Sequence, residues 1–163
     1  MKNPRTWLVA LLALALLLSA GALAACGSSS DSGSSSASAA SDVAAAVAGD
    51  AQISQYADAF KAAGISGDGP FTVFAASNDG ITASGATMSA EAVQASVIDG
   101  TNFAKADLEK GTKSDSMLAD NTIVTYVGTD GSLYVNDIKV IGEPITAGNG
   151  TVYVLDGAIQ PKQ

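Results

Sequence analysis

The feature that most constrains this chain is its single cysteine, Cys26, which directly follows a leader typical of exported proteins. Lys2 and Arg5 lie near the start, and a stretch rich in Leu and Ala runs from Trp7 to Leu18. A charged start, a short apolar core and small residues before the cleavage point are the parts of a secretory signal peptide. We therefore predict that residues 1–25 are removed and that the mature chain begins at Cys26.

The segment Leu23-Ala24-Ala25-Cys26 resembles the lipobox of bacterial lipoproteins, in which the cysteine carries acyl chains such as palmitate. The resemblance implies a bacterial cell-envelope protein, anchored by lipid on Cys26 to the extracytoplasmic side of a membrane. Because a lipidated Cys26 can form no disulfide, the fold must be stabilised by its hydrophobic core. The alternative is a plain secreted protein or a signal anchor with a free thiol. The choice between inner and outer membrane stays open.

The composition after the leader separates a tether from a folded domain. Residues 26–41 contain, after the cysteine, almost only Ser, Gly, Ala and Asp, and we predict a flexible tether with a reach of roughly 20 Å. Residues 42–163 have the length of one domain. Because Lys2 and Arg5 leave with the leader, the mature chain has six lysines against sixteen acidic residues, a net charge of about −10. Such a chain is repelled by nucleic acid, which excludes nucleic-acid binding as a function.

Apolar spacing and turn residues predict helices in the first part of the domain and short strands in the second, which is an α+β arrangement. Asp42 is expected to cap the first helix and Gly64 to end the second. The predicted helices span residues 43–47, about 53–63, 89–100 and 105–110. The predicted strands span residues 71–75, 122–127, 132–135, 138–141 and 151–155, with a hairpin turn at 128–131.

Two segments of the domain resemble the signature boxes of fasciclin domains. They are residues 69–78, Gly-Pro-Phe-Thr-Val-Phe-Ala-Ala-Ser-Asn, and residues 149–161, Asn-Gly-Thr-Val-Tyr-Val-Leu-Asp-Gly-Ala-Ile-Gln-Pro. The resemblance implies a single, short and divergent fasciclin-like fold, with N-terminal helices packed on a β-wedge or sandwich of short strands. We interpret the signature residues as mainly structural, with ligand contact as the alternative. They are Phe71, Thr72, Val73, Phe74, Asn78, Asn149, Gly150, Val152, Val154, Asp156 and Gly157.

The chain also departs from the fasciclin pattern. Family members usually carry a Tyr-His pair where this chain has Ala95-Ser96, and the region between Asn78 and Ser89 is short. In animal members a Glu-Pro-Asp-Ile motif is linked with integrin adhesion, whereas this chain has Glu143-Pro144-Ile145, which lacks the aspartate. Integrin-type recognition is therefore not carried over, and whether the missing pair abolishes adhesion stays open.

The chain has no histidine, which excludes a Ser-His-Asp or Cys-His nucleophile and a histidine metal cluster. No serine stands in a Ser-x-x-Lys frame. The acidic residues of the strand region lack the spacing of a calcium loop, and we interpret them as solvated turn residues. They are Asp115, Asp120, Asp130 and Asp137. We therefore predict a protein without catalytic residues, cofactor or metal.

The fasciclin resemblance implies a lipid-anchored surface module for cell adhesion, which contacts an extracellular protein or a polysaccharide without catalysis. The alternative is an envelope lipoprotein that binds a small apolar ligand in a pocket between helices and sheet. A cavity lined by Phe60, Phe74, Val97 or Leu155 favours the ligand, whereas a filled core with an exposed apolar or tyrosine patch favours the contact module. The strand tyrosines that could form this patch, or instead pack across strands, are Tyr126, Tyr134 and Tyr153. The identity of a partner and the oligomeric state stay open, and a purely structural domain is a third interpretation.

Overall fold

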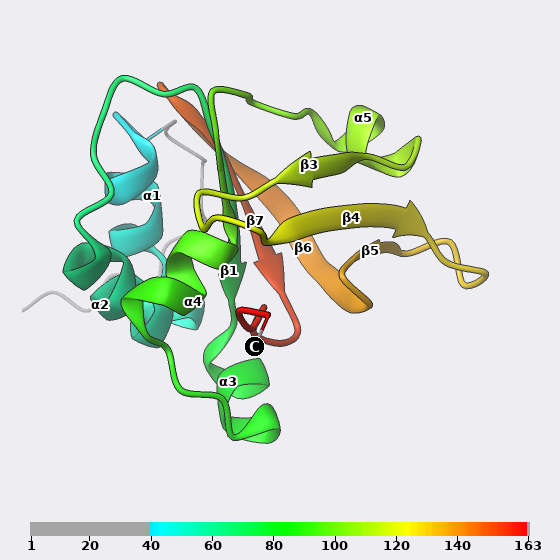
Figure 1. Cartoon of the computed structure of the whole chain (residues 1–163), viewed down its shortest axis with the longest axis horizontal. Coiled ribbons are helices and arrows are strands. Elements are labelled where there is room, and N and C mark those ends of the chain that lie inside the picture. The colour runs from blue at the N-terminus through cyan, green and yellow to red at the C-terminus, as the bar shows by residue number, and fades with distance from the viewer. Residues whose placement is uncertain (1–39, 163) are drawn as a thin grey trace, which may run out of the picture. The chain divides into compact units, whose positions relative to one another are not determined.

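The computed structural model describes residues 40–162, so the predicted signal peptide, Cys26 and most of the predicted tether lie outside it. Within these residues no helix has the length and apolar character needed to cross a membrane. Helices dominate the first part and strands the second, which confirms the predicted α+β class (Figure 1).

The helices begin and end at residues that favour such ends. The Asp42 carboxylate accepts the Ala45 N–H at 2.7 Å, which caps the first helix, and Gly64 ends α2 with a left-handed φ of +64°. Ile53, Tyr56 and Phe60 share the buried face of the second helical segment, as their spacing predicted. The helices are α1 (Val43–Gly49), the 3-10 turn η1 (Ala51–Ile53), α2 (Ser54–Ala63), α3 (Asn78–Ser84), α4 (Ala90–Ala95) and α5 (Lys105–Glu109).

The strands of the described residues form one seven-stranded sheet in the order β2-β1-β7-β6-β5-β4-β3. β1 and β7, which carry the two signature boxes, are its second and third strands and pair in parallel, and the other neighbours are antiparallel. The strands are β1 (Phe71–Ala76), β2 (Val97–Asp99), β3 (Lys113–Asp115), β4 (Thr122–Val127), β5 (Leu133–Val135), β6 (Ile138–Ala147) and β7 (Gly150–Leu155).

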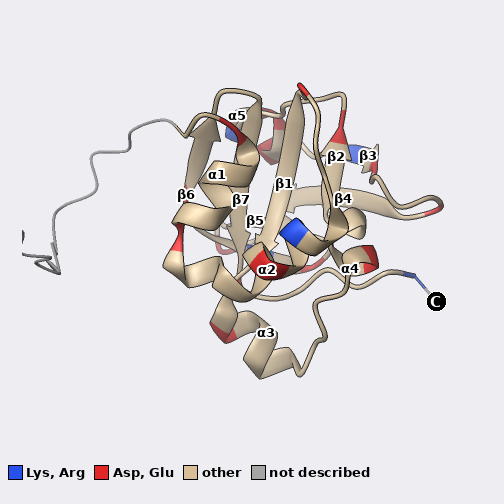
Figure 2. Cartoon of the chain, turned by 90° about the vertical axis from the view of Figure 1, so that its left-hand side faces the viewer, with Lys and Arg blue, Asp and Glu red and all other residues tan. Residues whose placement is uncertain are grey.

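β1 and β7 are buried along their whole length because both of their faces are covered. On one face Val73 and Val152 pack in a cluster with residues of α1 and α2, and Figure 2 shows these helices in front of β1 and β7. On the other face Phe74, Tyr153 and Leu155 pack with residues of α5, β4 and β5. The sheet therefore separates two hydrophobic clusters, with successive side chains of β1 and β7 entering opposite ones.

The structure corrects several predicted elements. The helix predicted over residues 89–100 ends at Ala95, and Val97–Asp99 forms β2, an antiparallel partner of β1. Val97 and Ile98 are β-branched and fully buried, which suits a strand beside β1 better than a helix turn. β6 continues beyond the predicted end to Ala147, past a register shift between Ile141 and Ile145. α3 and β3 were not predicted.

Candidate interaction surface

The second half of the sheet leaves one of its faces open. Along β4 the side chains alternate, so that Ile123 and Thr125 are buried whereas Val124 and Tyr126 are 42% and 39% exposed. Strand pairing extends this outward row because directly opposite residues share a face. The resulting open face consists of Lys113 on β3, Val124 and Tyr126 on β4, Tyr134 on β5 and Lys139 on β6.

Two stacked tyrosines form the centre of the open face. The rings of Tyr126 and Tyr134 lie 5.4 Å apart between centroids, with an interplanar angle of 10°. Tyr126 Oη donates a hydrogen bond to Asp137 Oδ1 at 2.8 Å, and this bond raises the pKa of Tyr126. Tyr134 Oη donates to Asp130 Oδ2 at 3.1 Å. Each ring is therefore held at its base by strand pairing and at its tip by a carboxylate.

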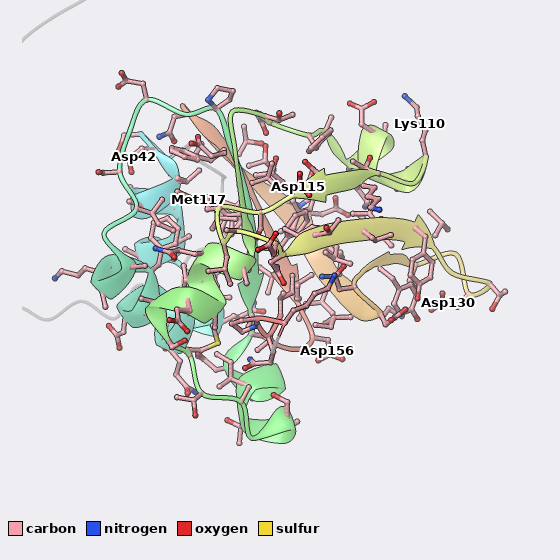
Figure 3. The ribbon with its side chains drawn as sticks, in the orientation of Figure 1. Asp42, Lys110, Asp115, Met117, Asp130 and Asp156 are labelled. Carbon is pink, nitrogen blue, oxygen red and sulfur yellow. The ribbon has the colours of Figure 1, made fainter. Side chains whose placement is uncertain are left out.

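The two carboxylates come from the turns that flank β5. Asp130 lies at the tip of the β4–β5 hairpin (Figure 3), where it also accepts the Ser132 N–H and the Lys139 ammonium. These bonds, the Ser132 N–H first, hold the pKa of Asp130 well below its usual range, so it is ionised near neutral pH. Asp137 belongs to the two-residue turn between β5 and β6, with φ of +66°. The neighbouring Asn136 accepts the Val124 N–H at 2.8 Å, which ties this turn to β4.

A shallow hollow of about 460 Å³ continues the open face toward the C-terminal segment. Val124 and Tyr126 supply its apolar wall, and Lys113 and Lys162 supply cationic groups. The ion pairs found among the described residues use Lys105, Lys110 and Lys139, and none of them includes Lys113 or Lys162. The open face thus offers an aromatic centre, an apolar side chain and cationic side chains on a rigid sheet, with the chemistry of a contact surface.

A comparison with protein families decides what kind of domain carries this surface. The family model of the fasciclin domain matches residues 48–161, which is well over half of the chain. The chain belongs to the fasciclin family. Fasciclin domains are generally adhesion-related extracellular modules and are generally non-catalytic. A comparison with curated proteins gave no significant match.

The fasciclin signature residues lie away from the open face. Phe71 and Val73 point into the cluster under the helices, Val152 and Val154 do the same from β7, and Phe74 stacks on Tyr153 in the opposite cluster. These side chains are buried to within 6% exposure. The hydrophobic signature positions therefore make up the interior of the two clusters.

The polar signature residues of this fasciclin domain bond to backbone groups. Thr72 Oγ1 donates to Thr101 O and accepts the Phe103 N–H. Asn78 accepts the Gln55 N–H at 3.0 Å and donates to Ala51 O, which joins the starts of α2 and α3. These contacts tie separate segments of the chain to one another.

The second box makes corresponding contacts. Asn149 accepts the Val43 N–H at 2.7 Å and donates to Gly67 O. A Cβ on Gly150 would lie only 2.3 Å from Phe71 O, so the close approach of β7 to β1 requires glycine there. Asp156 and Gly157 follow β7, and Gly157 lies against Ile138.

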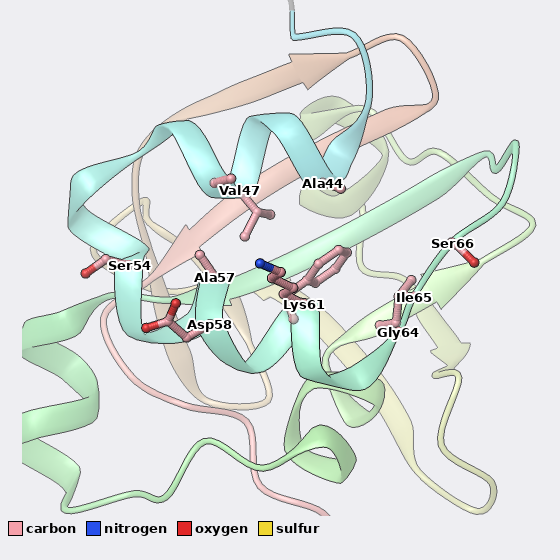
Figure 4. Close-up of a pocket in the computed structure, with 11 residues that line it drawn as sticks. Ala44, Val47, Ser54, Ala57, Asp58, Lys61, Gly64, Ile65 and Ser66 are labelled. Atoms are coloured by element: carbon pink, nitrogen blue, oxygen red, sulfur yellow. The ribbon is translucent and has the colours of Figure 1, made fainter.

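The four residues named for a ligand cavity between helices and sheet do not line one common space. Phe60 and Val97 belong to the cluster under the helices, whereas Phe74 and Leu155 belong to the opposite cluster. The reason is that successive side chains of a strand point to opposite faces of the sheet, which the odd and even positions of the first box already indicate. In the described residues the space near Phe60 is instead an open groove between α1 and α2, with a volume of about 650 Å³ (Figure 4).

The structure also removes Tyr153 from the predicted tyrosine patch. It is 1% exposed, and its hydroxyl donates to Phe103 O at 2.8 Å. Burial, with the charges of Asp107 and Glu109, raises the pKa of Tyr153 to about 12. The residues of the open face that sequence reasoning missed are Val124, Lys113 and Lys139, whose alignment beside the tyrosines depends on strand register.

Proposed function

We propose that this protein is a bacterial lipoprotein whose fasciclin domain makes non-catalytic contacts with an extracellular protein or polysaccharide through the open face. Lipid on Cys26 would hold it to the cell envelope, and residues 26–41 would act as the tether. The leader, the lipobox resemblance and the extracellular character of the family support the anchored location.

The observation that carries the proposal is the fixed tyrosine pair on the open face of the sheet, in which Tyr126 is exposed and Tyr134 is half-buried. Every buried side-chain nitrogen and oxygen of the described residues has a hydrogen-bond partner within the protein. The interior of the described residues therefore has no unpaired polar side chain that a ligand would satisfy. Tyr126 and Tyr134 instead direct aromatic surface outward, with their rotamers already restricted by stacking and by carboxylates. Rings that are ordered before binding lose less entropy when a partner covers them.

The acidic charge favours contact with a partner over contact with the membrane surface. A mature chain of about −10 charge is repelled by anionic lipid headgroups. A tether with a reach of roughly 20 Å lets such a domain stand clear of the membrane. Lipid at one end and an exposed contact face at the other are the parts that a surface adhesion module needs.

Replacement of Cys26 in intact cells tests the anchored part of this proposal. We expect the wild-type protein to partition with detergent, to be cut by added protease and to support attachment to a protein or polysaccharide surface. The Cys26→Ala protein should be shed or stay in the aqueous phase, and attachment should be lost with it. Equal detergent partitioning of the two proteins would show that Cys26 carries no anchor.

A specific observation favours a second candidate function, the binding of a small apolar ligand. The groove between α1 and α2 has a volume within the usual range of ligand sites, about 300–1,000 Å³. It lies on the helical side of the domain, away from the open face, so both functions could reside in one protein.

A further inference from the structure

The groove between α1 and α2 has an apolar floor and small side chains along its walls. Val47 and Phe60 line it from beneath but are only 1% and 3% exposed, whereas Ala44 and Ala48 are exposed and Ala57 is half-buried. Ile65 and Gly64 extend this surface beyond the end of α2. The helices use alanine at the positions where larger side chains would fill the space between them.

The shape of the groove suits a single extended chain. Val47 from α1 and Phe60 from α2 belong to one packed cluster, so the two helices touch beneath the groove. α1 has seven residues and α2 has ten, which at 1.5 Å per residue gives walls of only about 10 and 15 Å. A partner helix is itself about 10–12 Å wide and needs several turns to place its anchors. A groove of this length fits a single hydrocarbon chain better.

One cation stands beside this apolar surface. Lys61 and Asp58 both line the groove from α2 and are exposed, and in Figure 4 the Asp58 carboxylate lies toward the Ser54 end whereas the Lys61 ammonium lies nearer the middle of the groove. The ion pairs of residues 40–162 use Lys105, Lys110 and Lys139, and none of them includes Lys61. A ligand with an anionic head could therefore place that head at Lys61 and its tail along Ala44, Ala48 and Ala57.

We propose that the α1–α2 groove binds one long-chain fatty acid, with the carboxylate at Lys61 and the hydrocarbon tail along the alanine side chains. The charge of Lys61 selects the anionic head, and the apolar alanine surface selects the tail. This site is independent of the tyrosine pair and of the anchor, so its test can fail while the proposed contact function stands.

The test measures the affinity of saturated fatty acids of eight to fourteen carbons for the mature chain with Cys26→Ala, below their micelle concentrations, by calorimetry. Each added methylene that enters the groove should raise the affinity by up to about fourfold, until the groove is full. An affinity that is absent, or that does not change with chain length, overturns the proposal.

A matched pair of variants on α2 locates the site. Ala57 lines the groove, whereas Ala62 is exposed on the same helix and does not line it. Ala57→Phe should lower dodecanoate affinity at least tenfold, and Ala62→Phe should leave it within twofold. Equal effects of the two changes would place binding elsewhere and overturn the proposal.

Replacement of Lys61 tests the position of the carboxylate without adding volume to the groove. It also tests the proposed site if the Ala57→Phe protein does not fold. Lys61→Met should weaken dodecanoate by about two- to fivefold, the range of an exposed ion pair, and leave dodecanol unchanged. Lys110→Met, on α5, is the control and should change neither. If Lys61→Met weakens the acid and the alcohol equally, or weakens neither, the carboxylate does not sit at Lys61.

Discussion

The two halves of the sheet differ in how many of their faces are covered. β1 and β7 are covered on both faces, and every residue of these strands is buried. β4 has the same length but only one covered face, and two of its three outward positions hold Val124 and Tyr126 instead of polar side chains. The fully covered strands carry the family signature, and the half-covered strand carries apolar surface that packing does not explain. The residues that stabilise the fold and the proposed contact surface therefore lie on different strands of one sheet.

The largest effect should come from the doubly covered half. Phe74→Ala removes a ring that stacks on Tyr153 at 5.7 Å in a closed cluster. We expect the free energy of unfolding to fall by about 3–5 kcal/mol, because a buried aromatic ring is lost and a cavity is left. Urea denaturation measures this change. A loss below about 1 kcal/mol would mean that this cluster is not tightly packed.

Alkaline pH should destabilise the same half. Burial raises the pKa of Tyr56 above its usual range and that of Tyr153 to about 12, against 10 in an unfolded chain. Both groups fold as neutral phenols, so their contribution is complete below pH 10 and is lost as the pH rises toward 12. Thermal melts between pH 8 and 12 should show a falling midpoint above pH 10. In Tyr153→Phe the fall should be smaller, and an unchanged fall would mean that Tyr153 ionises as freely as in the unfolded chain.

A smaller loss of folding stability is expected when a hydrogen bond between two segments of the chain is removed. Asn149→Ala leaves the Val43 N–H and the Gly67 carbonyl without their partner, at a cost of about 1–3 kcal/mol. Asn102→Ala is a matched control at an exposed position, where we expect a change within about 0.5 kcal/mol. Denaturant midpoints of both variants measure the difference. Equal midpoints would show that the Asn149 ties do not stabilise the fold.

The smallest effect on stability should come from the open face. Tyr126→Ser removes a cross-strand aromatic pair that is exposed to solvent, and such pairs contribute about 0.2–1 kcal/mol. A loss as large as that of Phe74→Ala would assign the tyrosine pair to the scaffold and remove the contrast between the two halves. The same denaturation experiment on the Tyr126→Ser protein settles this.

Much of the fold was predictable because local signals and packing agree. β4 has its predicted bounds because alternating side chains end at the Gly128–Gly131 turn, and α2 ends at Gly64, as its apolar face and glycine indicate. β2 was predicted as helix because Ala92, Val93 and Val97 also fit a helical face. Only the pairing of Val97 with Val73 on β1 shows that residues 97–99 form a strand.

The site was less predictable for a related reason. Tyr126, Tyr134 and Tyr153 all stand on predicted strands, and the tyrosines alone do not show which of them lie on the open face and which is buried. What separates them is the covering of β7 on both faces and of β4 on one, which depends on how the whole chain packs. The α1–α2 groove likewise depends on alanines whose exposure follows from the separation of two helices.

Attachment of cells that display the protein tests most directly whether the open face makes the proposed contact. The double variant Tyr126→Ser/Tyr134→Ser is compared with Met117→Ser. Met117 is 38% exposed and does not belong to the open face, so its replacement removes a similar apolar exposure elsewhere. Surface amounts are matched by antibody, and attachment to immobilised extracellular proteins and polysaccharides is counted. The account predicts that the double variant loses attachment and that Met117→Ser keeps it. Attachment that survives in the double variant, at equal surface amount, would contradict the assignment of contact to the open face.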